Sequence, residues 1–301
     1  MHIITRDRIV YSFSRDHRPV GEVDSGDKIC FETYDARTGT ILSETDLLNQ
    51  PHPIGLNPAT GPLFVRGAEP GDTLCVEIQD IRLASQGFIG IKAGTGNLGH
   101  LAENYVTKII RIEGDTAHFD DRIRFPVRPM VGVIGTAPAE EAVPTLYPGP
   151  HGGNMDHQDA TIGSRVYLPV FVEGALFGLG DVHAAMGDGE ISMLGIEICA
   201  EVTVGVELIK GESIARPWIE TADAWITTGD APKLVDAITI ACEEMASLLQ
   251  RKLNVSFEEA YLLMSATGDV RIGQVCNPNN FPATIRVVLP KIDPTTPSTL
   301  S

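Results

Sequence analysis

The sequence predicts a mainly β protein, with a β-sandwich or barrel-like body and a smaller C-terminal α/β segment. Thirty glycines and twenty prolines interrupt the 301-residue chain. Short β-branched segments lie between these turn residues, which is typical of sandwiches and barrels. Helical periodicity of apolar residues begins only near residue 232. We therefore expect a β-rich body over residues 1–205, and over residues 206–301 an α/β segment that packs on it and ends in a flexible tail.

Two of the expected strands follow a similar sequence pattern. Gly26–Glu32 and Gly71–Glu77 both open with Gly-Asp and continue with alternating apolar residues. Such a pattern predicts a turn that leads into a strand, so the two segments are expected either to form similar hairpin edges or to share only the Gly-Asp pair, a common way to open a turn. The other strands expected in the body are Leu74–Ile78, Val131–Ile134, Val166–Val172 and Ile196–Val204.

Two helices and a strand are expected in the C-terminal segment. Asp230–Pro232 resembles a helix N-terminus, and apolar residues then recur every three or four positions as far as Asn254, a plausible stop. Ser256 and Glu259 have the spacing of a capping box for a second helix. A strand is expected over Ala283–Leu289.

Composition excludes several classes of protein. The net charge is −17, from 40 acidic against 23 basic residues, so binding to nucleic acid is not expected. Apolar runs are far shorter than the roughly 20 residues of a membrane span, and the N-terminus lacks the apolar core of a signal peptide. We expect no membrane partner and a cytoplasmic location. The five cysteines are scattered, which favours buried reduced thiols over disulfides or a cysteine zinc site.

Acidic, histidine and glycine residues concentrate between His151 and Glu190. Asp181 and His183 are two residues apart, so on a strand they project from the same face and can both reach one ion. Asp156 follows a glycine-rich turn that can bring a third ligand to the same point. A carboxylate and imidazole set suits Zn²⁺ or a similar divalent ion, although a solvated Asp beside a hydrogen-bonded His is the commoner meaning of an isolated D-x-H pair.

Other candidate site residues surround this set. Glu190 or Asp188 is expected to act as general base. The backbone N–H groups of Gly152 and Gly153 are expected to hold an oxyanion, because glycine permits close approach to a ligand. Further substrate-binding candidates are Asn154, in the same stretch, and His52, in a loop rich in turn formers.

Nucleophilic mechanisms have little support in the sequence. The chain has no Gly-x-Ser-x-Gly elbow, and no cysteine lies in a context that would lower its pKa. Gly163-Ser164 is not part of the serine- and glycine-rich run of a Ser-Ser-Lys amidase. Elimination leaves water activated by a metal or by a carboxylate, with a variant in which the metal is only structural.

Nearly the whole chain resembles the acetamidase/formamidase family. The segments that carry the resemblance are Asn57–Asp72, Arg128–Pro138, Gly149–Asp156 and Leu168–Glu190. The resemblance implies hydrolysis of a short-chain amide to a carboxylate and ammonia, a mainly β fold that forms homo-oligomers, and a divalent metal near the active centre. Arg66 and the run Ser192–Leu194 depart from the family pattern, so the exact amide is left open.

Two other functions stay open on the residues alone. A cupin-like metal-dependent oxygenase or isomerase would share the β architecture, but it normally needs clustered histidines such as H-x-H, which this chain lacks. A non-catalytic metal- or sugar-binding β module would explain the glycines without requiring so dense an acidic cluster. Release of ammonia from small amides is expected only of the amide hydrolase.

Overall fold

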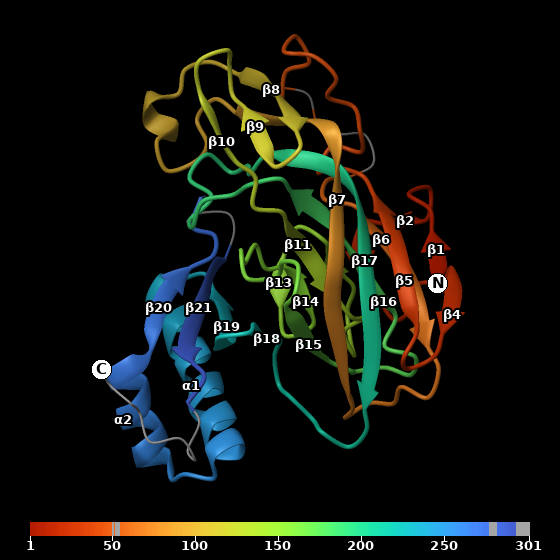
Figure 1. Ribbon diagram of the computed structural model, residues 1–301, viewed down its shortest axis with the longest axis vertical. Helices are drawn as coiled ribbons and strands as arrows, with labels where there is room; N and C mark the ends of the chain where they lie inside the picture. The colour runs from red at the N-terminus through yellow and green to blue at the C-terminus, as the bar shows by residue number, and fades with distance from the viewer. Residues whose placement is uncertain (50, 52–54, 277–281, 293–301) are drawn as a thin grey trace.

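A computed structural model describes residues 1–49, 51, 55–276 and 282–292 of the chain. Its mainly β architecture, with two helices near the C-terminus, confirms the predicted fold class (Figure 1). Among the described residues, nineteen of the strands belong to one continuous, curled hydrogen-bonded sheet, and β12 pairs with β3 apart from it. His52 falls outside the described residues.

The strands of the first half are β1 (His2–Ile4), β2 (Ile9–Val10), β3 (Ser12–Phe13), β4 (Gly21–Val23), β5 (Lys28–Thr33), β6 (Ala59–Val65), β7 (Thr73–Ile91), β8 (Val106–Glu113), β9 (Thr116–His118), β10 (Arg124–Pro126), β11 (Met130–Gly135), β12 (Val143–Pro144) and β13 (Pro148–Gly149). A 3-10 turn, η1, covers Gly99–Leu101.

The second half contains β14 (Gly152–Asn154), β15 (Arg165–Pro169), β16 (Phe177–His183), β17 (Glu197–Ile209), β18 (Trp218–Glu220), β19 (Ala224–Ala231), α1 (Leu234–Leu253), α2 (Phe257–Thr267), β20 (Asp269–Ile272) and β21 (Ala283–Pro290).

Each Gly-Asp turn leads into a strand, as predicted, but the expected hairpin edges are wrong. Among the described residues β5 pairs with β1 and β17, and β7 pairs with β8, β15 and β17, so neither strand lies at an edge. Gly26 and Gly71 have φ values of +96° and +95°, and the strands β5 and β7 follow them directly. Glycine adopts these positive φ angles without the strain that a Cβ atom would cause. β17 lies between β5 and β7 and pairs with both, so the two similar strands flank one long partner.

Long strands carry the main core of the body. β7 and β17 pair from Thr73 with Ile209 to Phe88 with Glu197, and both run the length of the body in Figure 1. β16 pairs with β11 and β6 and meets β17 only where His183 faces Glu197. That single crossing brings the ends of two strands together in the interior.

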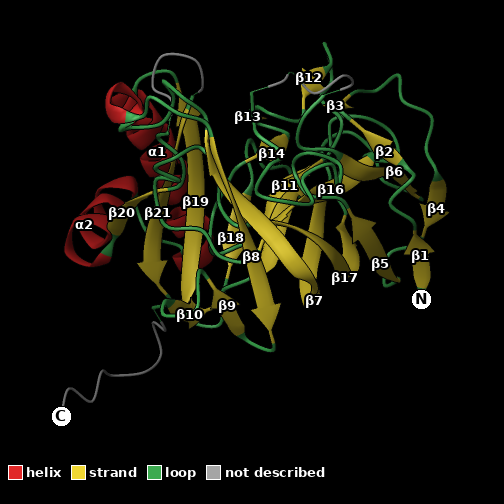
Figure 2. Ribbon diagram, turned by 90° about the horizontal axis from the view of Figure 1, so that it is seen from above, coloured by secondary structure: helices red, strands yellow, loops and turns green. Residues whose placement is uncertain are grey.

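The C-terminal segment packs its helices on one side of β19 and β21 (Figures 1 and 2). The predicted apolar face of α1 is buried at Ala241, Met245, Leu248 and Leu249, whereas Leu234, in its first turn, is 40% exposed. Asn254 ends the helix in the left-handed conformation, as expected.

The second helix and the last strand match their predicted positions. Ser256 and Glu259 form the predicted capping box of α2. β21 extends one residue beyond the expected strand, to Pro290. None of the helices in the described residues has the length and apolar character that a bilayer crossing requires.

The predicted start of the first helix is wrong. Asp230 pairs with Thr284 in the ladder between β19 and β21 and forms an ion pair with Arg216. α1 therefore begins only at Leu234, with Lys233 as an N-cap that makes no side-chain capping bond. Tertiary pairing overrides the local capping signal here.

The cysteines carry no disulfide. All five are free thiols, as predicted, and Cys30, Cys75 and Cys276 are buried. The fold is therefore stabilised without disulfide bonds.

Candidate metal centre

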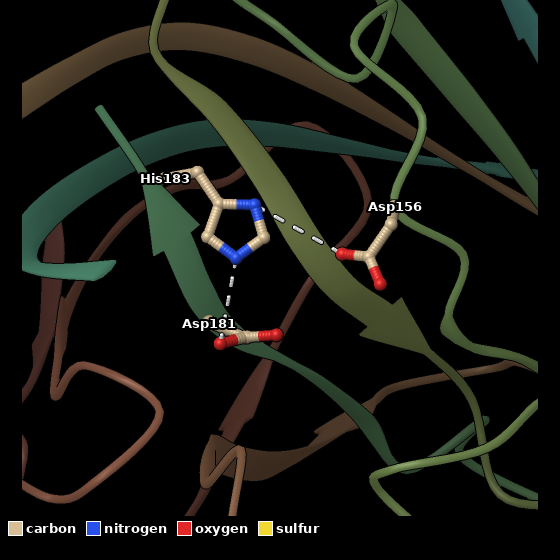
Figure 3. A group of neighbouring side chains, drawn as sticks. All are labelled: Asp156, Asp181 and His183. Carbon is tan, nitrogen blue, oxygen red and sulfur yellow. Dashed lines mark ion pairs between the residues drawn. The ribbon is translucent and has the colours of Figure 1, made fainter. Parts of the chain in front are cut away.

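β16 delivers two of the predicted ligands to one point. Asp181 and His183 are each 1% exposed, and His183 Nε2 lies 3.8 Å from Asp181 Oδ1 (Figure 3). Asp181 has a φ of +53°, which is unusual for a residue within a strand. The two side chains lie side by side, as the two-residue spacing predicts.

Asp156 approaches the same imidazole from its other edge. It follows β14, has a φ of +48°, and places Oδ1 4.0 Å from His183 Nδ1 (Figure 3). The ligand atoms that Asp156, Asp181 and His183 offer all lie within 4.8 Å of one another. The structure thus brings the three predicted metal ligands together in the interior.

Two glutamates complete the cluster. Glu197 opens β17 opposite His183, and its Oε1 lies 3.2 Å from His183 Nε2. Glu190, from the loop between β16 and β17, forms a second group of potential ligands with His183 and Glu197. Glu190 is one of the site residues predicted from the sequence, whereas Glu197 is not, because its position depends on the pairing of the two strands.

Two amide side chains donate hydrogen bonds to carboxylate oxygens of this cluster. Asn57 Nδ2 donates to Asp181 Oδ2 at 2.7 Å and to Asn154 Oδ1 at 3.4 Å. Gln274 Nε2 donates to Asp156 Oδ2 at 2.7 Å and to Glu190 Oε2 at 2.8 Å. Asn154, a predicted site residue, is therefore linked to the centre through Asn57. Neither Asn57 nor Gln274 was predicted from the sequence as a site residue.

Burial dominates the electrostatics of the four carboxylates. It raises the pKa of Asp156, Asp181, Glu190 and Glu197 above their usual values, and repulsion from Glu190 adds to this at Asp156 and Glu197. Burial disfavours the protonated form of His183, but the nearby Asp181, Asp156 and Glu190 outweigh it and raise its pKa. Ionised together, these groups need a compensating positive charge.

The residues present fit a divalent cation. Asp156 Oδ1, Asp181 Oδ1, Glu197 Oε2 and His183 Nδ1 are all buried and have no hydrogen-bond partner. Buried polar atoms without partners are rare in native proteins, so several of them converging on one point indicate a ligand. Carboxylate oxygens with one imidazole form a set that holds Zn²⁺ or similar divalent ions.

Gly132 keeps the space between the aspartates open. A Cβ atom at this position would lie 2.6 Å from Asp156 Oδ1 and 2.8 Å from the carbonyl oxygen of Asp181. Glycine is required here by its lack of a side chain and not by a special backbone angle. The residue belongs to the segment that carries the family resemblance, but its role is visible only in the structure.

Asp188 does not join the cluster. Both of its carboxylate oxygens accept hydrogen bonds from Arg286 Nη2, at 2.7 and 2.9 Å, and Oδ1 also accepts one from Gln158. Its side chain is 39% exposed, in contrast to the buried Glu190. Of the two predicted base candidates, the structure brings only Glu190 to the predicted metal ligands.

The glycines of the predicted oxyanion site lie in β14. Gly152 and Gly153 are buried, have φ values of +99° and +83°, and would press a Cβ atom onto the carbonyl oxygens of Ile134 and Tyr147. β14 pairs with β11 on one side and β13 on the other. Close strand packing therefore accounts for both glycines, and an oxyanion contact from their N–H groups stays a prediction.

The fold and this centre define a β-rich protein with a buried, carboxylate-rich site for a divalent cation. Comparison with known proteins identifies the family. Residues 6–145 and 139–291 match the Acetamidase/Formamidase family, and the chain belongs to it.

Solved structures and relatives of similar sequence agree with this family. An acetamidase from Bacillus halodurans is 40% identical with a TM-score of 0.90, over 96% of this chain and 97% of that one. A predicted acetamidase/formamidase from Thermoanaerobacter tengcongensis is 40% identical with a TM-score of 0.92, over 96% and 95%. A putative formamidase of Schizosaccharomyces pombe is 29% identical over 62% of this chain; the match spans 61% of that relative's length.

Gly132→Ala is expected to weaken binding of a divalent cation about tenfold or more, because the added methyl group would displace Asp156 and Asp181. Calorimetric titration of the metal-stripped protein with Zn²⁺ measures this affinity. Gly187→Ala is the matched control, since a Cβ atom there meets nothing within 4 Å. Equal affinities of the Gly132→Ala and wild-type proteins would contradict the placement of the site.

Proposed function

We propose that this chain hydrolyses the C–N bond of small linear amides, of the formamide or acetamide type, to a carboxylate and ammonia. The observation that carries the proposal is the buried cluster of four carboxylates around His183 in a chain of the acetamidase/formamidase family. Every one of these five side chains is at most 5% exposed, which suits a small substrate. A single histidine among carboxylates also differs from the clustered histidines that a cupin-like oxygenase or isomerase would need.

Asp156, Asp181 and His183 are proposed to hold a divalent cation, most simply Zn²⁺, with Glu197 as a further ligand from β17. Such an ion would polarise the amide carbonyl and activate water. The unpartnered oxygens of Asp156, Asp181 and Glu197 support this assignment, because a cation would supply the interaction that each of them lacks.

Glu190 is proposed to act as the general base. It would take a proton from water as the water oxygen bonds to the carbonyl carbon, and deliver that proton to the nitrogen as the C–N bond breaks. Burial raises the pKa of Glu190 above its usual value, and a raised pKa favours such a proton carrier near neutral pH. The N–H groups of Gly152 and Gly153 keep their proposed role at the oxyanion, and Asn154 is proposed to contact the substrate.

Three broader predictions accompany this function. We propose that the protein works as a homo-oligomer in the cytoplasm and acts on small molecules, without nucleic acid or membrane as partners. The exposed apolar side chains of α2 support self-association, since Phe257, Tyr261 and Leu262 are between 52% and 70% exposed. A net charge of −17 opposes contact with a phosphate backbone.

The purified protein is expected to release ammonia from formamide, acetamide or propionamide, and a coupled ammonia assay measures it. Removal of the metal with a chelator should abolish the activity, and added Zn²⁺ should restore it, because the ligand set is built around a cation. A non-catalytic binding module would release no ammonia from any amide. Full activity of metal-stripped protein, and of Asp181→Ala and His183→Ala, would refute the metal-dependent scheme.

Glu190→Gln is expected to lower kcat for amide hydrolysis by about 10²–10⁴, the usual contribution of a general base. Asp188→Asn is the matched comparison: it should lower the melting temperature by weakening the Arg286 ion pair while kcat stays near the wild-type value. Steady-state kinetics on correctly folded protein separates the loss of catalysis in Glu190→Gln from the loss of stability in Asp188→Asn. If Asp188→Asn were as inactive as Glu190→Gln, the assignment of the base would be wrong.

A further inference from the structure

Gln274 is the one amide side chain in contact with two of the buried carboxylates among the described residues. Its Nε2 donates to Asp156 Oδ2 and Glu190 Oε2, at 2.7 and 2.8 Å. In a cluster ionised around a cation these carboxylates only accept hydrogen bonds, so the NH₂ group of Gln274, and not its oxygen, faces them. This sets the orientation of the amide and therefore the direction of Oε1.

Oε1 of Gln274 is a buried acceptor without a partner. The residue is 5% exposed, and this oxygen has no hydrogen-bond donor within the described part of the chain. Buried acceptors in native proteins almost always have a partner. The oxygen therefore lacks a donor from any residue that the structure describes, and a bound ligand can supply one.

Oε1 lies close to the carboxylates of the proposed metal centre. The oxygen and nitrogen of one amide group are roughly 2.3 Å apart. Since Nε2 is 2.7 and 2.8 Å from the two carboxylate oxygens, Oε1 cannot be more than about 5 Å from either of them. A group at the reacting end of a substrate bound beside Asp156 and Glu190 is therefore within reach of Oε1.

The backbone around Gln274 is held firmly in place. Its N–H donates to Thr284 Oγ1 at 2.7 Å, and its carbonyl oxygen accepts from Thr284 N at 2.9 Å. On the other side, Gly189 N donates to the carbonyl oxygen of Gly273, and Val275 N donates to that of Gly189. Oε1 is consequently a preorganised acceptor, because the side-chain amide and the backbone are both fixed.

We propose that Gln274 recognises the substrate, and that its Oε1 accepts a hydrogen bond from the NH₂ group of a primary amide. The inference rests on the proposed amide hydrolysis and specifies its substrate class. A primary amide carries N–H donors on the atom that leaves. The leaving oxygen of an ester and the nitrogen of an N,N-disubstituted amide carry none. Gln274 therefore favours primary amides over both.

The contact is compatible with the whole reaction. The C–N bond breaks and the nitrogen gains the proton carried by Glu190, so the leaving ammonia still has N–H groups to donate. A neutral carbonyl oxygen accepts these bonds without adding a fifth negative charge to the cluster. Gln274 thus differs in role from Glu190, which moves a proton, and from Asp156, which would hold the cation.

The test compares acetamide with p-nitrophenyl acetate, an activated ester whose leaving oxygen carries no hydrogen. Gln274→Met has nearly the same shape and lacks both the donor and the acceptor. Gln274→Glu keeps an acceptor oxygen but loses the NH₂ donor and adds a negative charge, which should lower the activity on both substrates alike. We measure kcat/KM for both substrates and the bound metal by mass spectrometry, and express activity per bound metal ion. The amide-to-ester ratio is expected to fall about tenfold in Gln274→Met and to stay near the wild-type value in Gln274→Glu.

The outcomes separate the inference from the function on which it rests. If Gln274 only positions the carboxylates, both substrates lose activity together and an unchanged ratio in Gln274→Met overturns the inference. If wild-type protein releases no ammonia from acetamide, the proposed function itself fails. Should Gln274→Met not fold, Gln274→Lys decides instead, because it keeps donors and lacks an acceptor: a ratio lowered about tenfold supports recognition, and an unchanged ratio overturns it.

Discussion

The burial of four carboxylates around one imidazole is the constraint on which the rest of this structure depends. Burial opposes their ionisation and so raises the pKa of all four carboxylates, and the unpartnered oxygens of Asp156, Asp181 and Glu197 have no hydrogen bonds from the described residues that would compensate it. A bound cation would resolve both problems at once. The local strain at Asp156 and Asp181, which have positive φ angles, is consistent with a site held in shape for a ligand.

The C-terminal segment completes this centre. Gln274 bridges two of the carboxylates, and the buried Arg286 ties Asp188 and Asp159 to β21 just beyond them. The cluster therefore lies where the body meets the α/β segment. Because the ligands come from β14, β16, β17 and their loops, binding of a cation would also stabilise the fold that assembles them.

Local patterns in the sequence predicted part of this arrangement. The spacing of Asp181 and His183 indicated a shared strand face, and the glycine-rich turn indicated Asp156, because both depend on neighbours in the chain. Glu197 was missed because it reaches His183 through strand pairing across the loop 184–196. Gln274 was also missed, because its contacts with Asp156 and Glu190 join segments that lie even farther apart in the sequence. The mainly β class followed from turn spacing, whereas the start of α1 was misplaced because Asp230 is held by long-range pairing.

The content of divalent metal in the purified protein tests the central claim most directly. Wild-type protein and Asp156→Asn/Asp181→Asn would be prepared in the same zinc-containing buffer, desalted, and analysed by plasma mass spectrometry. The buried carboxylate cluster predicts at least one divalent ion per chain in the wild type and almost none in the double variant. A folded wild-type protein that carries no metal, or a double variant that carries as much, would contradict it.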